Sequence, residues 1–256
     1  MPGRLTQQVA DAFLPHPPDV LGVAVSGGGD SMALLHLLHG LCAFHGTKLR
    51  AVTVNHGLRP QAAAEAEMVQ RFCATLGVRH DTLLWENWDG SGNLQNAARN
   101  ARFALMADWA TAQEISTIAL GHTADDQAET FLMRLARRSG VNGLAGMSAR
   151  ILREGVTWVR PLLKANRAEL RGYLQAHDIE WIEDPSNDDA AFERVKARRV
   201  LEALAPLGID AEGLSAVATH MAQARTALDW HTFLAAREIA EVDAGAVVIC
   251  GRKLRI

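Results

Sequence analysis

The stretch from Val23 to Ser31 constrains the fold of this chain more than any other segment. The apolar run Val23-Ala24-Val25 is followed by Ser26 and three consecutive glycines, and Asp30-Ser31 then opens an apolar helical segment, Met32 to Leu38. A strand, a tight glycine turn and a helix N-terminus direct unpaired backbone N–H groups and the positive end of the helix dipole at one spot. The pattern therefore predicts a strand-loop-helix unit that binds nucleotide phosphates.

The glycine loop differs from two common phosphate-binding motifs, because it contains neither G-x-G-x-x-G nor G-x-x-x-x-G-K-[ST]. Its order Ser-Gly-Gly-x-Asp-Ser resembles the pyrophosphate loop (PP-loop) of the N-type ATP pyrophosphatases, which cleave ATP to AMP and pyrophosphate. The resemblance implies an ATP site made of Ser26, Gly27, Gly28, Gly29, Asp30 and Ser31. It also implies that Asp30 holds a Mg²⁺ ion against the phosphates. The alternative is an ordinary glycine-rich turn in an α/β protein that binds no nucleotide.

Composition indicates a soluble enzyme with a full core. A chain of 256 residues with 48% hydrophobic content is long enough for one large domain and a smaller appendage. The segment from Met1 to Asp11 has no apolar signal region, and no run approaches the ~18 apolar residues of a membrane span, so we expect a cytoplasmic protein without a membrane partner. Cys42, Cys73 and Cys250 are far apart, which favours neither a disulfide framework nor a zinc or iron–sulfur site.

Short apolar runs alternate with helical segments from Val20 to about Ser148. Four runs lack polar alternation, as is typical of parallel strands covered on both faces: Leu21–Val25, Leu49–Val54, Thr82–Trp85 and Thr117–Leu120. In the third helical segment, we expect one apolar face made of Leu94, Ala98, Ala101, Leu105 and Trp109. The alternation predicts an α/β fold with a doubly wound parallel sheet, whose ligands bind beyond the carboxyl ends of the strands.

Polar motifs follow three of these strands. Asn55 and His56 come after the second strand, Arg99 and Arg102 share a helix face after the third, and His122 begins a polar segment after the fourth. Each residue also has a structural interpretation, as a hydrogen-bonded loop side chain or a solvated surface charge. All of them together, at the ends of neighbouring strands, favour a binding site.

The segment after the fourth strand carries a pair of carboxylates. Asp126 and Glu129 are spaced i, i+3 near a helix start, so their side chains share a face and the helix dipole favours their ionised forms. The neighbouring Asp125 has the simpler interpretation of a helix cap. A carboxylate pair that faces a nucleotide site can bind a cation, either a metal ion or an amine.

Basic residues are concentrated in one part of the chain, although its net charge is only -3. Nine basic residues and two acidic ones lie between Arg134 and Gly172. A patch of this sign can neutralise nucleic-acid phosphates. A solvated helix and hairpin surface is an equal alternative.

The order of these motifs is similar to that of the tRNA(Ile)-lysidine synthase family. The resemblance covers roughly residues 20 to 205 and rests on Ser26–Ser31, Val54–Arg59, Ala98–Phe103, His122–Thr130, Arg138–Leu144, Arg160–Leu163 and Glu183–Asn187. There are three departures. Asn55 replaces a common acid, Arg138 replaces a common glycine, and the segment from Arg194 to Arg198 lacks an asparagine.

Members of this family are ATP-dependent ligases that form a C–N bond. They join the ε-amine of free L-lysine to C2 of the wobble cytidine of the isoleucine tRNA with a CAU anticodon, through an adenylated tRNA, and release AMP and pyrophosphate. The resemblance implies catalytic roles for Asp30, Arg102, Asp126 and Glu129. It adds Asn55 and His56 to the ATP site, and it implies lysine binding by Arg102, His122, Asp126 and Glu129. It implies tRNA binding by Arg137, Arg138, Arg194 and Arg198.

The same resemblance implies two parts in the chain. Residues 1–205 would form a PP-loop catalytic domain with an adenine nucleotide alpha hydrolase-like fold. Residues 206–256 would form a small helical extension, either a naturally short or a truncated tRNA-binding part, with apolar residues Leu214, Val217, Met221, Ala224 and Leu228 at heptad-like spacing. Two alternative functions stay open: another PP-loop tRNA-modifying enzyme such as a tRNA cytidine thiolase, and an ATP-binding module without catalysis. A homodimer stays open as well.

Overall fold

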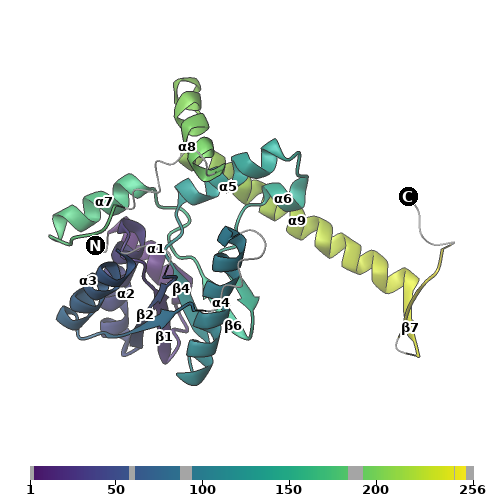
Figure 1. The fold of residues 1–256 in the computed structure, drawn as a ribbon. Coiled ribbons are helices and arrows are strands. Elements are labelled where there is room, and N and C mark those ends of the chain that lie inside the picture. The colour runs from purple at the N-terminus through teal and green to yellow at the C-terminus, as the bar shows by residue number, and fades with distance from the viewer. Residues whose placement is uncertain (1–2, 58–60, 87–93, 184–192, 245, 252–256) are drawn as a thin grey trace.

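A central sheet organises the computed structural model, which describes residues 3–57, 61–86, 94–183, 193–244 and 246–251 (Figure 1). The sheet has six strands in the order β3-β2-β1-β4-β6-β5. The parallel strands are β1 (Val20–Ala24), β2 (Lys48–Asn55), β3 (Arg79–Leu84), β4 (Thr117–Leu120) and β6 (Val156–Val159). The edge strand β5 (Arg150–Arg153) pairs antiparallel with β6. The predicted doubly wound parallel sheet is confirmed, with one antiparallel strand added at its edge.

Helices cover both faces of this sheet and form two apolar cores. The helices of the domain are α1 (Arg4–Phe13), α2 (Gly29–His45), α3 (Ala62–Thr75), α4 (Leu94–Ala112), α5 (Ala124–Ala136), α6 (Val141–Leu144), α7 (Arg167–Ala176) and α8 (Glu193–Leu204). One core contains buried side chains of α1, α2, α3 and α7, and the other contains those of α4. Burial on both faces explains why the parallel strands lack polar alternation.

The buried face of α4 differs from the expected one. Phe103 and Met106 are buried there, whereas Leu94, Ala98, Ala101 and Leu105 are half-buried. Of the expected residues, Trp109 is buried. Aromatic packing explains the rotation of the face, because the ring of Phe103 lies edge-on against the buried Trp158 with centroids 4.7 Å apart.

The strand order fixes where a ligand can bind. The strands β2 and β3 lie on one side of β1, and β4, β6 and β5 lie in that order on the other side. The carboxyl ends of β1 and β4 therefore border the crevice in which open α/β sheets bind ligands. The loops after these two strands are in contact, since a Cβ added at Gly121 would lie 3.0 Å from the carbonyl oxygen of Asp30.

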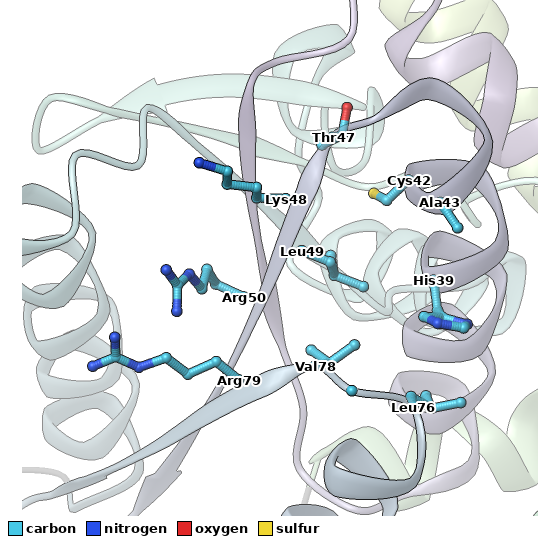
Figure 2. Close-up of a pocket in the computed structure, with 11 residues that line it drawn as sticks. His39, Cys42, Ala43, Thr47, Lys48, Leu49, Arg50, Leu76, Val78 and Arg79 are labelled. Atoms are coloured by element: carbon cyan, nitrogen blue, oxygen red, sulfur yellow. The ribbon is translucent and has the colours of Figure 1, made fainter.

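A hollow of about 330 Å³ lies at the amino ends of the strands, where β2 and β3 begin (Figure 2). Leu49 and Val78 face His39 and Cys42 of α2, while Lys48 and the neighbouring arginines project to the other side of the strands (Figure 2). This alternation follows from the pleat of β2. The hollow is remote from the crevice and contains none of the predicted site residues.

The C-terminal part forms a long helix, α9 (Ala211–Ile239), that projects from the domain and ends at a hairpin of β7 (Ala240–Asp243) and β8 (Ala246–Ile249) (Figure 1). Ser215 and Ala218 are buried, and the Ser215 hydroxyl donates a hydrogen bond to the carbonyl of Leu163 at 3.3 Å. Farther along, Leu228, Trp230 and Phe233 are exposed. The expected helical extension is therefore present, but its heptad-like apolar residues include the exposed Val217 and Leu228. No helix of the described residues is both long and apolar enough to span a membrane.

Candidate active site

The glycine loop joins β1 to α2 in a tight turn. Gly27 has a φ of +86°, and a Cβ at this position would lie 2.6 Å from Cδ1 of Ile182. The Ser31 hydroxyl donates to the carbonyl of Gly28 at 2.9 Å and accepts from the backbone N–H of Ser26 at 3.1 Å. Only glycine combines this backbone conformation with this close approach. The glycines therefore allow a tight turn at the N-terminus of α2, where a helix end can bind an anion.

A capping box fixes the start of α5 after β4. The Thr123 side chain accepts from the N–H of Asp126, and the Asp126 carboxylate accepts from the N–H of Thr123 at 2.9 Å. Asp125 is therefore not the cap. Its carboxylate instead accepts a hydrogen bond of 2.8 Å from the backbone N–H of Arg167.

A single guanidinium joins the carboxylates of the two loops. Arg167 lies at 2.9 Å from Asp126 Oδ1, 2.7 Å from Glu129 Oε1 and 3.4 Å from Asp30 Oδ2. Three carboxylates that the sequence predicted as site residues therefore surround one cation at the N-terminus of α7. The structure brings Asp30, Asp126 and Glu129 together as expected from their positions at the strand ends.

Sequence reasoning missed Arg167 as a site residue and counted it only within the basic segment. A signal was nevertheless present. Asn166 and Glu169 form a capping box, which places Arg167 at the first position of a helix. A cation is unfavourable near the positive end of the helix dipole, so its presence there calls for an acidic partner elsewhere in the fold.

Helix α8 adds two further arginines to the carboxylate pair. Arg198 Nε lies 2.7 Å from Glu129 Oε1, and Arg194 Nη1 lies 3.8 Å from Asp126 Oδ1. Glu129 is fully buried, yet its second oxygen, Oε2, accepts no hydrogen bond from the residues that the structure describes. A buried carboxylate oxygen without a partner carries a desolvation penalty. It marks a position where a ligand could donate.

Burial and ion pairing shift the pKa values of these groups in different directions. Burial raises the pKa of Asp30 to about 6, although Arg167 acts against it. Burial also acts to raise the pKa of Asp126, but the positive charge of Arg167 and the hydrogen bond from the N–H of Thr123 act against it, and the pKa is lowered. For Arg167, the surrounding carboxylates outweigh burial and raise the pKa. Asp126 and Arg167 are therefore both charged near neutral pH.

His122 is half-buried beside this cluster. Its Nδ1 accepts a hydrogen bond of 3.3 Å from Nε of Arg160, and burial lowers the pKa of the imidazole to about 3 although Asp126 acts in the opposite direction. His122 is therefore neutral at pH 7. In this state it can donate a hydrogen bond from Nε2 but does not act as a second cation.

The residues after β2 form a separate part of the site. His56 is half-buried and lies edge-on to Trp85, and its Nδ1 has no hydrogen-bond partner among the described residues. Burial and the positive charge of Arg102 lower the pKa of His56. Asn55 Oδ1 accepts from the N–H of Gly57 at 2.8 Å, and its amide N–H groups form no hydrogen bond with the other residues that the structure describes. Arg102 forms no ion pair with Asp126 or Glu129.

The chain is similar in sequence to proteins of one known family. The PP-loop domain family matches residues 2–204. The tRNA(Ile)-lysidine synthase of Ruegeria pomeroyi is 53% identical over 251 residues, which cover 98% of this chain and 60% of that protein. The tRNA(Ile)-lysidine synthase of Hyphomonas neptunium is 48% identical over 78% of this chain and 57% of its own length. That of Zymomonas mobilis is 41% identical over 90% of this chain and 69% of its own length.

The chain belongs to the tRNA(Ile)-lysidine synthase family. It spans 60% and 57% of the first two of these relatives. Among solved structures, the U34-tRNA thiolase NcsA from Methanococcus maripaludis superimposes with a TM-score of 0.72 over 86% of this chain and 76% of its own, at 16% sequence identity. This structural likeness shows the shared fold.

Two departures from the lysidine synthase pattern have a structural setting. Arg138, which replaces a common glycine, has a left-handed φ of +57° just after α5. The N–H groups of Arg138 and Ser139 bond back to the carbonyls of Leu135 and Arg134, which is the helix ending that favours glycine. Arg194 and Arg198, from the segment that lacks its asparagine, contact the carboxylate pair instead of lying free on the surface.

The other two predicted tRNA-binding residues lie at the end of α5. Arg137 and Arg138 are exposed, and Arg137 forms an ion pair with Glu193. Of the predicted motif 183–187, only Glu183 lies within the described residues, where its carboxylate pairs with Arg171. Leu58 and Arg59 of the second motif also lie outside the described residues.

Proposed function

We propose that this chain ligates free L-lysine to C2 of the wobble cytidine in the CAU anticodon of isoleucine tRNA, with cleavage of ATP to AMP and pyrophosphate. One observation carries the proposal. The buried carboxylates of Asp126 and Glu129 bind the guanidinium of Arg167 beside the phosphate loop, and Glu129 Oε2 has no hydrogen-bond partner among the described residues. An ATP-binding module without catalysis has no need of such a cation site.

The first step activates the cytidine. The C2 carbonyl oxygen is a poor leaving group, and transfer of AMP to this oxygen makes AMP the leaving group instead. The loop N–H groups and the hydroxyls of Ser26 and Ser31 would bind the phosphates of ATP and stabilise the departing pyrophosphate. Nδ1 of His56 is buried and has no partner within the described part of the chain, so it fits the same ATP site as an acceptor.

Asp30 is suited to holding a Mg²⁺ ion together with phosphate oxygens. The described residues contain no group of three or more His, Cys, Asp or Glu side chains arranged to hold a metal ion alone. Mg²⁺ is commonly bound by one or two carboxylates and substrate phosphates, which fits a single carboxylate at the phosphate loop. When bound, the ion would neutralise charge on the pyrophosphate.

The second step is attack of lysine on C2. The ε-ammonium of free lysine has a pKa of about 10.4 and must lose a proton before it attacks. Asp126 and Glu129 would bind this ammonium, and the proton would pass to one of these carboxylates or to a phosphate. Because Arg167 now contacts both carboxylates, lysine must either replace part of this contact or use the free Oε2 of Glu129.

The alternative function is that of a tRNA thiolase. A thiolase that uses an iron–sulfur cluster needs several cysteines close together to bind it. Burial raises the pKa of Cys42 to about 11 and that of Cys73 to about 12, which makes both thiols poor metal ligands. Cys250 is exposed next to the C-terminal hairpin, where its N–H bonds to the carbonyl of Ile239. These positions favour the ligase.

Incubation of the 256-residue protein with ATP, Mg²⁺, radiolabelled lysine and a CAU-anticodon tRNA transcript tests the proposal. We expect label in acid-precipitated tRNA, with one AMP and one pyrophosphate released per lysine. A transcript that differs only in the wobble base is the matched control and should remain unlabelled. Pyrophosphate release without labelled tRNA, or no release at all, would contradict the assignment.

A further inference from the structure

A second cavity lies beside α5, on the C-terminal side of the carboxylate pair. The steps described above do not use it. It measures about 230 Å³ and is lined by Arg99, Arg134, Arg137, Arg194, Thr130, Met133 and Met147. Four arginines from α4, α5 and α8 therefore converge on one hollow. We call it the arginine cavity.

The arginine cavity adjoins the candidate active site. Arg194 lines the cavity and also lies 3.8 Å from Asp126, and Thr130 follows Glu129 directly in α5. At a rise of about 1.5 Å per residue, Arg134 lies roughly 8 Å along the helix axis from Glu129. A polynucleotide whose reacting base lies at the carboxylate pair would therefore have a backbone phosphate within reach of the cavity.

The arginines of the cavity differ in whether a carboxylate neutralises their charge. Arg137 pairs with Glu193, but Arg134 donates to the carbonyls of Gly143 and Gly146 at 2.7 and 3.0 Å, which leaves its full charge. Arg99 lies over the ring of Phe103 at 5.9 Å, and no carboxylate of the described residues forms an ion pair with it. Burial lowers the pKa of Arg99, and so do Arg194, Arg153 and Arg134. Such mutual repulsion is relieved when an anion binds.

The size and lining of the cavity define the anion. Its volume is below the ~300–1,000 Å³ of pockets for drug-sized ligands, so it suits one phosphate group better than a whole nucleotide. Guanidinium groups match the tetrahedral oxygens of phosphate with paired hydrogen bonds. Met133 and Met147 add apolar surface against which a sugar can pack.

We propose that the arginine cavity binds one backbone phosphate of the tRNA strand beside the nucleotide that is modified, and that Arg99 and Arg134 are the residues that hold it. The identity of the polyanion rests on the proposed function. The assignment of the cavity as an anion site rests on its four arginines alone. Inorganic pyrophosphate offers the same phosphate chemistry and is the source that the experiment has to separate from tRNA.

Arg99→Gln is the suitable variant, because Arg99 has none of the carbonyl contacts of Arg134 and no ion pair with Asp126 or Glu129. Filter binding of the CAU transcript across a KCl series, without ATP or lysine, measures its effect. Each neutralised phosphate contributes about 0.7 to 0.9 to the slope of log K against log salt. We expect Arg99→Gln to weaken binding and to lower the slope by this amount, and Arg99→Lys to restore most of it.

Arg71→Gln is the matched control, since Arg71 is an exposed arginine of α3 that pairs with Glu67. It should leave the slope, the melting temperature and the ATP affinity unchanged. An unchanged slope in Arg99→Gln, or a change in pyrophosphate inhibition and ATP affinity instead, would overturn the proposal. The binding assay needs no turnover. A chain that forms no lysidine but loses slope in Arg99→Gln would therefore contradict the proposed function and leave the phosphate site standing.

Discussion

At the scale of single residues, Arg167 determines the electrostatics of the candidate site. Its guanidinium lies among the carboxylates of Asp30, Asp126 and Glu129, and its side chain is only 22% exposed. Carboxylates this close repel one another unless a cation lies between them. Arg167 therefore holds the loop after β1 against the helix after β4 until substrates bind.

Removal of Arg167 should destabilise the fold. Arg167→Met leaves Asp126 and Glu129 with less compensation, and loss of one partner of a buried ion pair typically lowers the free energy of unfolding by about 3 kcal/mol or more. Urea denaturation followed by circular dichroism measures the change. The double variant Arg167→Met with Glu129→Gln should recover part of the loss. A single variant as stable as the parent would show that the ion pairs contribute little.

Asp30→Asn should abolish ATP cleavage and leave the fold intact. The change removes the charge of a carboxylate whose pKa burial already raises to about 6, and it removes no core volume. Circular dichroism and melting should therefore match the parent, while tRNA-dependent pyrophosphate release is lost. Near-normal pyrophosphate release by the variant would show that Asp30 has a different role.

At the scale of elements, the ends of helices and strands define the site. The sequence predicted β4 at Thr117–Leu120, where the structure has it, but it predicted the third strand at Thr82–Trp85, whereas β3 is Arg79–Leu84. Polar side chains hid the start of β3, because His80 bonds to Thr53 and Asp81 accepts from the indole of Trp109. Such contacts join distant segments and leave no local periodicity.

The same reasoning explains which site residues could be predicted. Asp30, Asp126 and Glu129 follow strands with clear apolar patterns, so the sheet topology alone brings them together. Arg167 and Arg198 reach the site from α7 and α8, which follow no strand of the predicted set. Their partners are fixed by tertiary packing, which a single sequence without strand order does not reveal.

Arg138→Gly should stabilise the end of α5. Arg138 has a φ of +57° at a helix ending that favours glycine, and a non-glycine residue in this conformation is disfavoured by about 1 kcal/mol. For a chain of this size, we expect the melting temperature to rise by about 2–4 °C. Arg137→Gly is the control and should destabilise, because Arg137 has a φ of -86°. A melting temperature that does not rise in Arg138→Gly would mean that the turn is not strained.

At the scale of the whole molecule, both the basic segment and the C-terminal extension contain residues that are packed into the fold. Arg160 and Arg167 of the basic segment bond to His122 and to carboxylates within the fold, so fewer of its charges face solvent than the sequence suggests. The extension is also partly internal. Ser215 and Ala218 of α9 are buried, beyond the predicted domain boundary at residue 205.

Two shortened chains test where the folded domain ends. A chain of residues 1–225 keeps the buried turns of α9 and should melt near the temperature of the parent, because the removed part of α9 is exposed at Leu228, Trp230 and Phe233. A chain of residues 1–205 lacks Ser215 and Ala218 and should melt at a lower temperature. Equal melting of the two shortened chains would support a boundary at residue 205.

The central claim is that the carboxylate pair binds the amine of lysine and the glycine loop binds ATP. Glu129→Gln tests it most directly, because glutamine keeps the size of the side chain and an acceptor for Arg167 and Arg198 while it removes the charge. The measurement is the yield of adenylated tRNA and of lysine-labelled tRNA from one reaction with radiolabelled ATP and lysine. We predict that the variant still forms adenylated tRNA and that lysine transfer is lost or needs far more lysine. Loss of adenylation with an unchanged lysine requirement would contradict the claim and would assign Glu129 to the ATP site.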